Sequence, residues 1–220
     1  MKANNKKNKT KYMTTVLVLV IATLISLTGC GAKKAKKVEE TTKKPDETVA
    51  IHAGNTDVYL DEAKYYAYTA QATYETYYLT KNKEINWSSK TKAKVTMEEM
   101  VKSTVLDDIC RRECMYEYGM KNGVKLEDEE KQELDLKLEN YYKLTSPVLV
   151  EKIRVERKRL QEIFEKDAIA KKTEEVLDAM EKNLAEKTYK TWKNENTVTA
   201  EKQWEEITFS KPIFTLKDLN

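Results

Sequence analysis

Two cysteines on one helical face and a single histidine carry the widest range of chemistry in this 220-residue sequence. Cys110 and Cys114 are four residues apart, which places both on the same side of a predicted helix. A redox pair would need a Cys-x-x-Cys spacing at a helix start, and a metal site would need further ligands nearby. A disulfide between them would distort the helix, so we expect two core thiols, no metal site and no cofactor. The lone His52 also excludes most histidine-based catalysis.

A second feature with binding chemistry is a group of six tyrosines between residues 65 and 78. They cover more than one helical face, so they cannot all lie in the core. Tyrosine combines apolar area with a polar tip at a low entropic cost, which suits contact with varied polypeptides. Packing between helices explains some of these tyrosines. A carbohydrate-binding surface is another alternative, but the tryptophan cluster that usually stacks on sugars is absent from this stretch of sequence. We expect a client-binding surface that includes Tyr65, Tyr68, Tyr74 and Tyr78.

Composition narrows the fold and function classes. Five glycines and three prolines are too few for an all-β sandwich, a dinucleotide fold or a P-loop enzyme. With 35% charged and 40% hydrophobic residues, the chain is typical of amphipathic helices around modest cores. Acidic residues are so abundant that no pair of them can be identified as a catalytic carboxylate pair. The body from Val49 onward has 29 basic and 33 acidic residues, so a nucleic-acid partner is not expected.

The N-terminus predicts export and anchoring. Five lysines precede an apolar run over residues 13–27, the pattern of a signal peptide that ends at residue 29. The tetrapeptide that ends in Cys30 resembles the lipobox of bacterial lipoproteins, which implies a diacylated Cys30 and a body anchored at the cell membrane on its extracytoplasmic side. An uncleaved transmembrane anchor over residues 13–32 is the alternative. Residues 30–48 are interpreted as the lipidated cysteine and a flexible tether.

The first half of the body predicts a hairpin and three helices. Turn chemistry at residues 54–57 separates two short apolar runs, which predicts a β-hairpin. Asp61 is the expected cap of a helix to about Thr80, with Tyr77 on its apolar face. Thr96 opens a capping box for the next helix, which is expected to end at residues 121–123. The acidic run at residues 127–130 suits the positive dipole end of another helix.

The second half predicts one long helix and a returning tail. Ser146 and Pro147 are expected to start a helix, broken once, that runs to about Lys190 with Met180 on its buried side. The basic stretch at residues 154–159 is interpreted as a solvated helix face. Residues 197–199 and 204–209 have strand-like composition, and we expect this tail to pair with the N-terminal hairpin. The predicted fold is mainly α, with a small sheet formed by the N- and C-terminal segments.

The order of these segments resembles one known family. Residues 49–66, VAIHAGNTDVYLDEAKYY, look like the opening hairpin and helix of the SurA/PrsA foldase family. Residues 105–115 and 121–126 are similar to the helix and turn that follow in that family, and the resemblance spans roughly residues 49–180. It implies a SurA N-terminal-like helical chaperone domain over residues 49–220. The glycine-rich parvulin isomerase domain of other members has no counterpart in the sequence, so no enzyme activity is expected.

The sequence therefore predicts a membrane-anchored, extracytoplasmic chaperone-like lipoprotein that binds unfolded exported polypeptides. One alternative is an envelope adaptor lipoprotein that binds one folded partner. Another is a degenerate peptidyl-prolyl cis-trans isomerase. A solute-binding protein is disfavoured, because two α/β lobes do not fit into so short a chain with so little glycine.

Overall fold

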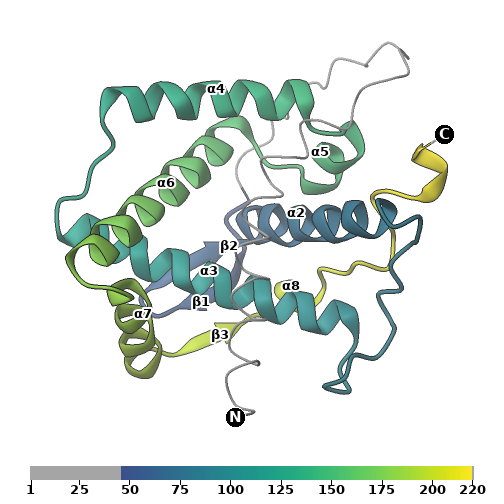
Figure 1. The fold of residues 1–220 in the computed structure, drawn as a ribbon, viewed down its shortest axis with the longest axis horizontal. Helices are drawn as coiled ribbons and strands as arrows, with labels where there is room; N and C mark the ends of the chain where they lie inside the picture. Colours follow the sequence, from purple (N-terminus) through teal and green to yellow (C-terminus); the bar gives the residue numbers. More distant parts are fainter. Residues whose placement is uncertain (1–45, 220) are drawn as a thin grey trace.

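The computed structural model describes residues 46–219, which are mainly helical with one small sheet (Figure 1). The expected signal peptide, Cys30 and most of the tether lie outside the described residues. None of the helices within residues 46–219 is long and apolar enough to cross a membrane. The elements are β1 Val49–Ala53, β2 Thr56–Tyr59, α2 Leu60–Leu79, α3 Met97–Lys121, α4 Asp128–Leu144, α5 Pro147–Ile153, α6 Arg157–Met180, α7 Leu184–Glu195, β3 Val198–Ala200, α8 Lys202–Glu205 and a 3-10 turn Leu216–Leu219.

The sheet joins the two ends of the described chain, as the sequence predicted. Its strand order is β2-β1-β3, and both pairings are antiparallel. Gly54 makes the hairpin turn with φ +63°, a conformation that favours glycine, and its N–H donates to the Thr197 carbonyl at 3.0 Å. The hairpin and its pairing with a C-terminal strand are confirmed.

Local capping signals set most helix boundaries. Thr96 and Glu99 form the predicted capping box of α3, with the Glu99 N–H donating to Thr96 Oγ1 at 3.1 Å. The expectation that Asp61 caps α2 is wrong. Leu60 already begins that helix, because its N–H is engaged by the Thr48 carbonyl at 2.8 Å. Asp61 instead lies buried in the first helical turn.

The long helix predicted after Pro147 is broken twice. Arg154 (φ 52°) ends α5 and Asn183 (φ 61°) precedes α7, and each left-handed residue interrupts the regular hydrogen-bond series. The breaks let α6 cross the long helix α3, where the two pack closely along Gly119 and Thr173. The expected strand at residues 204–209 is also absent. Its first part forms the short helix α8, and the rest is irregular backbone beside α2.

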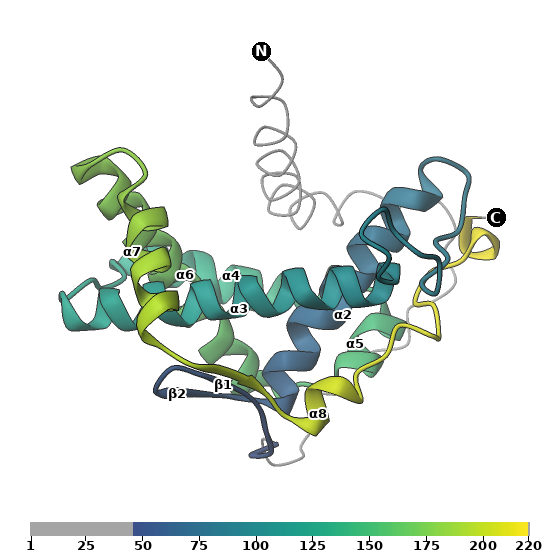
Figure 2. The same ribbon diagram turned by 90° about the horizontal axis from the view of Figure 1, so that it is seen from below.

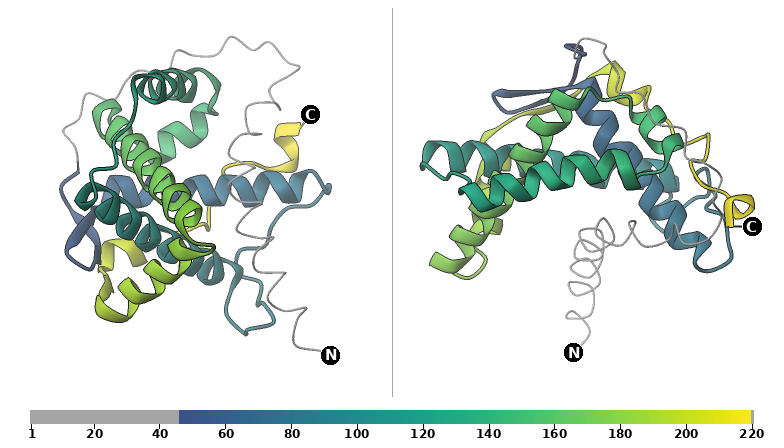
Figure 3. Two further views of the ribbon diagram at one scale, coloured as in Figure 1. Left: turned by 60° about the vertical axis from the view of Figure 1, so that its left-hand side comes forward. Right: turned by 90° about the horizontal axis from the view of Figure 1, so that it is seen from above.

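The described residues form an arch, seen from below in Figure 2 and from above in the right panel of Figure 3. The sheet and α8 lie on its convex side, while α7 and the C-terminal part of α2 project from the opposite side. Two expected core positions lie on these projecting ends and are exposed. Tyr77 is near the end of α2, and Met180 ends α6. Both were placed by helical spacing alone, and the buried positions in these last turns are taken by Leu79 and Leu177 instead.

Candidate functional site

The tyrosines of α2 divide into a buried and a partly exposed set. Tyr65 and Tyr66 are each only 7% exposed. The Tyr65 ring packs against Phe164 of α6 at 5.9 Å and Tyr141 of α4 at 6.3 Å between ring centroids. The expectation that Tyr65 lies on a client-binding surface is therefore wrong, because its side of α2 faces two other helices.

The other three candidate tyrosines keep part of their surface in solvent. Tyr68 packs against Phe209 of the C-terminal tail, with ring centroids 6.5 Å apart. Tyr74 packs edge-on against Trp87, at 6.2 Å. Tyr78 is half-buried against the exposed Tyr77 at 5.9 Å. The structure thus spreads these rings along the length of α2 and does not gather them into one patch.

An open groove lies between α2 and α5, beside Tyr68. Its volume is about 430 Å³, and its lining residues are Lys64, Tyr68, Val148, Glu151, Lys152 and Arg154. The Lys152 ammonium stands 4.6 Å from the centroid of the Tyr68 ring, a cation–π distance. Val148 is 55% exposed at the groove wall. The groove therefore combines an aromatic ring, an aliphatic side chain and three cations against one carboxylate.

A second surface along α2 binds the chain's own tail, which we define as residues 206–216. In Figure 2 the tail, in yellow, leaves α8 and follows α2 toward the far end of that helix. Ile207, Phe209 and Ile213 turn their side chains into the body and are buried, while Thr208 and Ser210 point outward. Phe209 contacts Trp87 edge-on at 4.8 Å.

Glu75 is the central group of this surface. It is buried, yet its carboxylate accepts four hydrogen bonds, so its lone pairs are satisfied. Trp87 Nε1 and Gln71 Nε2 donate to one oxygen, at 3.1 and 2.7 Å. The N–H groups of Ile213 and Phe214 donate to the other oxygen, at 2.7 and 2.9 Å. The position thus links α2, the following loop and the tail.

A layer of buried charges joins α2, α3 and α6 on the other side of α2. Lys166 of α6 lies between two carboxylates, with its ammonium 2.8 Å from Glu62 Oε1 and 2.7 Å from Glu113 Oε1. Burial raises the pKa of Glu62 to about 7, although Lys166 opposes the shift. Burial likewise raises the pKa of Glu113. Burial alone would lower the pKa of Lys166, but the two carboxylates outweigh it and raise that pKa.

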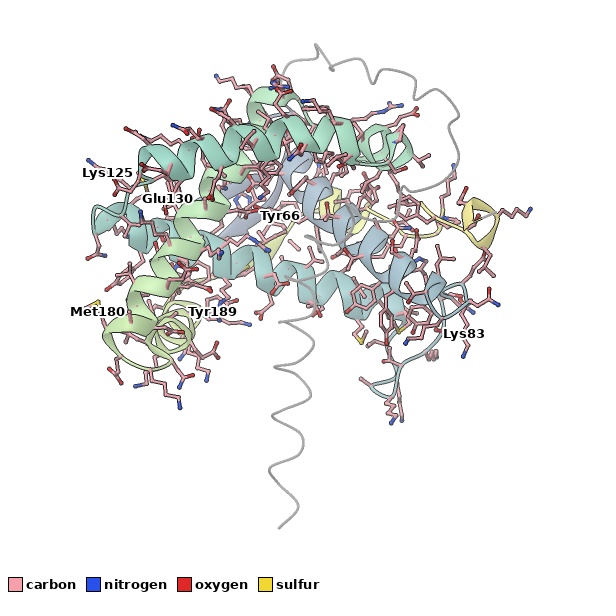
Figure 4. The ribbon with its side chains drawn as sticks, turned by 45° about the horizontal axis from the view of Figure 1, so that its top comes forward. Tyr66, Lys83, Lys125, Glu130, Met180 and Tyr189 are labelled. Atoms are coloured by element: carbon pink, nitrogen blue, oxygen red, sulfur yellow. The ribbon has the colours of Figure 1, made fainter. Side chains whose placement is uncertain are left out.

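This layer continues toward the concave side of the arch, where Figure 4 shows Tyr66 between the helices. The Tyr66 hydroxyl donates to Asp167 Oδ1 at 2.9 Å, and Arg112 pairs with the same oxygen at 3.0 Å. A cavity of about 280 Å³ opens beside Glu62 and Lys166, and none of its lining residues is a Ser, Cys or His. The layer thus holds charge and protons beside a cavity lined mainly by charged side chains.

The remaining residues singled out by the sequence occupy structural places. Cys110 and Cys114 are buried free thiols, and burial raises the pKa of each to about 12. His52 lies on the sheet, with Nδ1 2.6 Å from Asp57 and Nε2 3.5 Å from Glu201. No group of three metal-binding side chains gathers within residues 46–219. The basic stretch is not simply solvated, because Arg159 pairs with the buried Asp61 at 3.4 Å.

Sequence reasoning missed the buried polar groups, although helical spacing marks several of them. Glu113 continues the apolar series Val101, Val105 and Ile109 at intervals of four residues. Gln71 and Glu75 continue the series of Ala63 and Ala67 in the same way. A polar residue in register with a buried stripe is thus the signal that would have found them.

Comparisons with protein-family models, with curated proteins and with solved structures find no match to this chain.

Proposed function

We propose that this protein is a membrane-anchored, extracytoplasmic lipoprotein that holds unfolded exported polypeptides through the groove between α2 and α5. The groove carries the proposal. It offers the Tyr68 ring and the exposed Val148 as apolar contacts, with Lys64, Lys152 and Arg154 around them. An unfolded chain presents mixed apolar and acidic segments, which such a lining binds weakly and without a fixed sequence.

Anchoring would make weak contacts effective. The lipidation proposed at Cys30 and the tether after it would keep the groove close to the membrane where exported chains emerge. Confinement raises the local concentration of the binding surface without any new contact. No nucleotide or other cofactor enters this scheme. The resemblance to the SurA/PrsA foldases supports the same interpretation.

The proposal is tested by suppression of aggregation. The chain from Gly31 to Asn220, which contains every described residue, would be mixed with a denatured client at stoichiometric ratios and followed by light scattering. We expect clear suppression by this protein and its loss in Val148→Glu. Val148 is exposed, so the change leaves the core intact.

A matched control is Val176→Glu on α6, where a valine that is 43% exposed lies outside the groove. It makes the same change of charge and volume, and we expect it to suppress aggregation like the parent. Failure of the parent protein to suppress aggregation would refute the holdase function. Capture of one folded partner at fixed stoichiometry would then favour the adaptor alternative.

A further inference from the structure

The tail is held through its backbone, by side chains that belong to the rest of the body. The Lys102 ammonium donates to the Ile207 carbonyl at 2.9 Å, and Glu98 Oε1 accepts the Phe209 N–H at 3.0 Å. Glu75 accepts two further N–H groups of the tail. The remaining contacts are Gln71 Nε2 to the carbonyls of Phe209 and Lys211 at 3.3 and 3.0 Å, Lys152 Nζ to the Lys211 carbonyl at 2.8 Å, and the Leu216 N–H to Glu84 Oε1 at 2.9 Å.

These contacts do not depend on the identity of the tail residues. Every one of them uses a backbone N–H or carbonyl, which any polypeptide segment supplies. The side chains of the tail matter for binding only at Ile207, Phe209 and Ile213, which are buried against apolar residues of the body. The arrangement resembles a peptide receptor, in which main-chain hydrogen bonds give affinity and pockets for selected side chains give specificity.

The receptor side of this surface is built from buried polar groups. Gln71 and Glu75 are at least nine-tenths buried, and both aim polar atoms at the tail. The Gln71 amide is itself held in place, because Lys152 Nζ donates to its Oε1 at 2.8 Å. A row of polar groups fixed in this way is preorganised for the backbone of a segment that bends at Ser210, Lys211 and Ile213. Within residues 206–216 no backbone pairs with the sheet, so side chains provide the main attachment.

The tail surface is continuous with the open groove between α2 and α5. Tyr68 lines that groove and packs against Phe209 of the tail. Lys152 also lines the groove and donates to the Lys211 carbonyl. A polypeptide seated in the place of the tail would therefore reach directly into the open groove beside it.

We infer that the tail occupies a polypeptide-binding site in cis. When the tail leaves, the site takes a segment of an unfolded chain that follows the same bent path, with apolar residues at positions i, i+2 and i+6, the spacing of Ile207, Phe209 and Ile213. The tail is then a built-in competitor that limits binding until a client displaces it. This inference rests on the proposed function, and it adds the ligand class and the regulation of the site.

The first test is hydrogen–deuterium exchange of the unmodified chain from Gly31 to Asn220. Release of the tail exposes the amides of Phe209, Ile213 and Phe214 without unfolding the body. We expect these amides to exchange faster than those in the middle of α3. Equal protection of the tail and of α3 would show that the tail leaves only on global unfolding, and it would overturn the inference.

The second test uses a fluorescent peptide of residues 206–216, EITFSKPIFTL, and the variant Phe209→Ser of the whole chain. Weakening the tail raises the fraction of open sites, and the apparent affinity for the peptide rises in proportion. We expect binding at least about tenfold tighter in the variant than in the parent. Ser210→Ala, an outward-facing change in the same segment, should bind like the parent. A scrambled peptide that breaks the apolar spacing should not bind.

The two proposals fail in different ways. No binding of the peptide to a folded Phe209→Ser variant would overturn the tail inference, whereas aggregation suppression that depends on Val148 would stand. If Phe209→Ser does not fold, the hydrogen-exchange rates of the tail in the unmodified chain decide whether the tail inference stands. Peptide binding without any suppression of aggregation would support the tail site and refute the holdase.

Discussion

Glu75 and Ile213 are 138 residues apart in the sequence, yet the Ile213 N–H donates to Glu75 Oε2 at 2.7 Å in the interior of the protein. The same oxygen accepts the Phe214 N–H at 2.9 Å. A buried carboxylate is costly unless its oxygens are fully hydrogen-bonded, and here the tail supplies half of the donors. The seated tail therefore completes the hydrogen bonding of this one buried side chain.

Replacement of Glu75 should destabilise the fold strongly. Glu75→Ala removes an acceptor shared by four donors. The Gln71 amide keeps the carbonyls of Phe209 and Lys211, but Trp87 Nε1 and the Ile213 N–H lose their partner in the interior, so we expect a loss of about 3 kcal/mol in the free energy of unfolding. Glu84→Ala is the control, because Glu84 accepts a single tail N–H at an exposed position and should change stability by less than about 1 kcal/mol. Urea unfolding measures the free energy of unfolding of both variants, provided that its dependence on urea concentration is the same as in the parent. Equal, small losses in the two variants would contradict the role given to Glu75.

Local signals were sufficient for much of the fold. The hairpin around Gly54, the capping box at Thr96 and the start at Pro147 each depend on residues within a few positions, and each was predictable. Asp61 shows where such signals fail. In a sequence, an acid at the cap position cannot be told from an acid in the first helical turn. Asp61 falls in the first turn because α2 begins at Leu60, whose N–H donates to the carbonyl of Thr48, earlier in the sequence.

The candidate site depended on tertiary packing and was less predictable. Tyr65 and Tyr68 are the same residue type three positions apart on one helix, but only tertiary structure puts one against Phe164 and the other beside a groove. Residues 204–209 have the alternation of a strand, and Ile207 and Phe209 are indeed buried. Their backbone groups, however, bond to side chains of distant helices such as Lys102 and Glu98, which no local pattern reveals.

The buried triad of Glu62, Lys166 and Glu113 should give a stability that depends on pH. Burial raises the pKa of Glu62 to about 7 in the folded protein, from an ordinary value of 4.5 in the unfolded chain. As the pH rises between these values, the unfolded chain loses this proton before the folded protein does. The stability that Glu62 contributes is fully present below pH 4.5, and about 3 kcal/mol is lost by pH 7.

The measurement compares the parent with Glu62→Gln by urea unfolding at pH 5 and pH 7.5. Because glutamine does not titrate, the variant should gain stability relative to the parent as the pH rises, by roughly 2–3 kcal/mol over this range. Glu162→Gln changes an exposed acid on α6 and should follow the parent at both pH values. A constant difference between parent and Glu62→Gln would show that Glu62 titrates normally.

The two core thiols should be inert in the native protein. Burial raises the pKa of Cys110 and of Cys114 to about 12, so their thiolate fraction at pH 8 is very small. We expect a thiol-reactive dye to label the chain from Gly31 to Asn220 at least about a hundredfold more slowly in buffer than in urea. Ser103→Cys, an exposed position on the same helix, is the positive control and should react at once. Fast labelling of the native parent would refute the core assignment.

Gly119 should resist even the smallest side chain, against the usual preference of helices. Alanine normally stabilises a helix by about 1 kcal/mol relative to glycine. A Cβ at position 119, however, would lie 2.1 Å from Thr173 Oγ1, where α3 and α6 cross. The Thr173 hydroxyl has little freedom to yield, because it donates to the Ile169 carbonyl at 2.8 Å. We therefore expect Gly119→Ala to lower the free energy of unfolding by about 1–3 kcal/mol.

The double variant Gly119→Ala with Thr173→Ala identifies the cause. Removing the hydroxyl removes the clash, so the double variant should be more stable than Gly119→Ala alone, with a coupling of about 1 kcal/mol or more between the two sites. Gly123→Ala serves as the comparison, since a Cβ there meets no atom within 4 Å and its cost comes only from φ +72°. Additive effects of the Gly119 and Thr173 changes would mean that the helices shift to admit the new methyl group. The crossing of α3 and α6 would then be looser than the distances indicate.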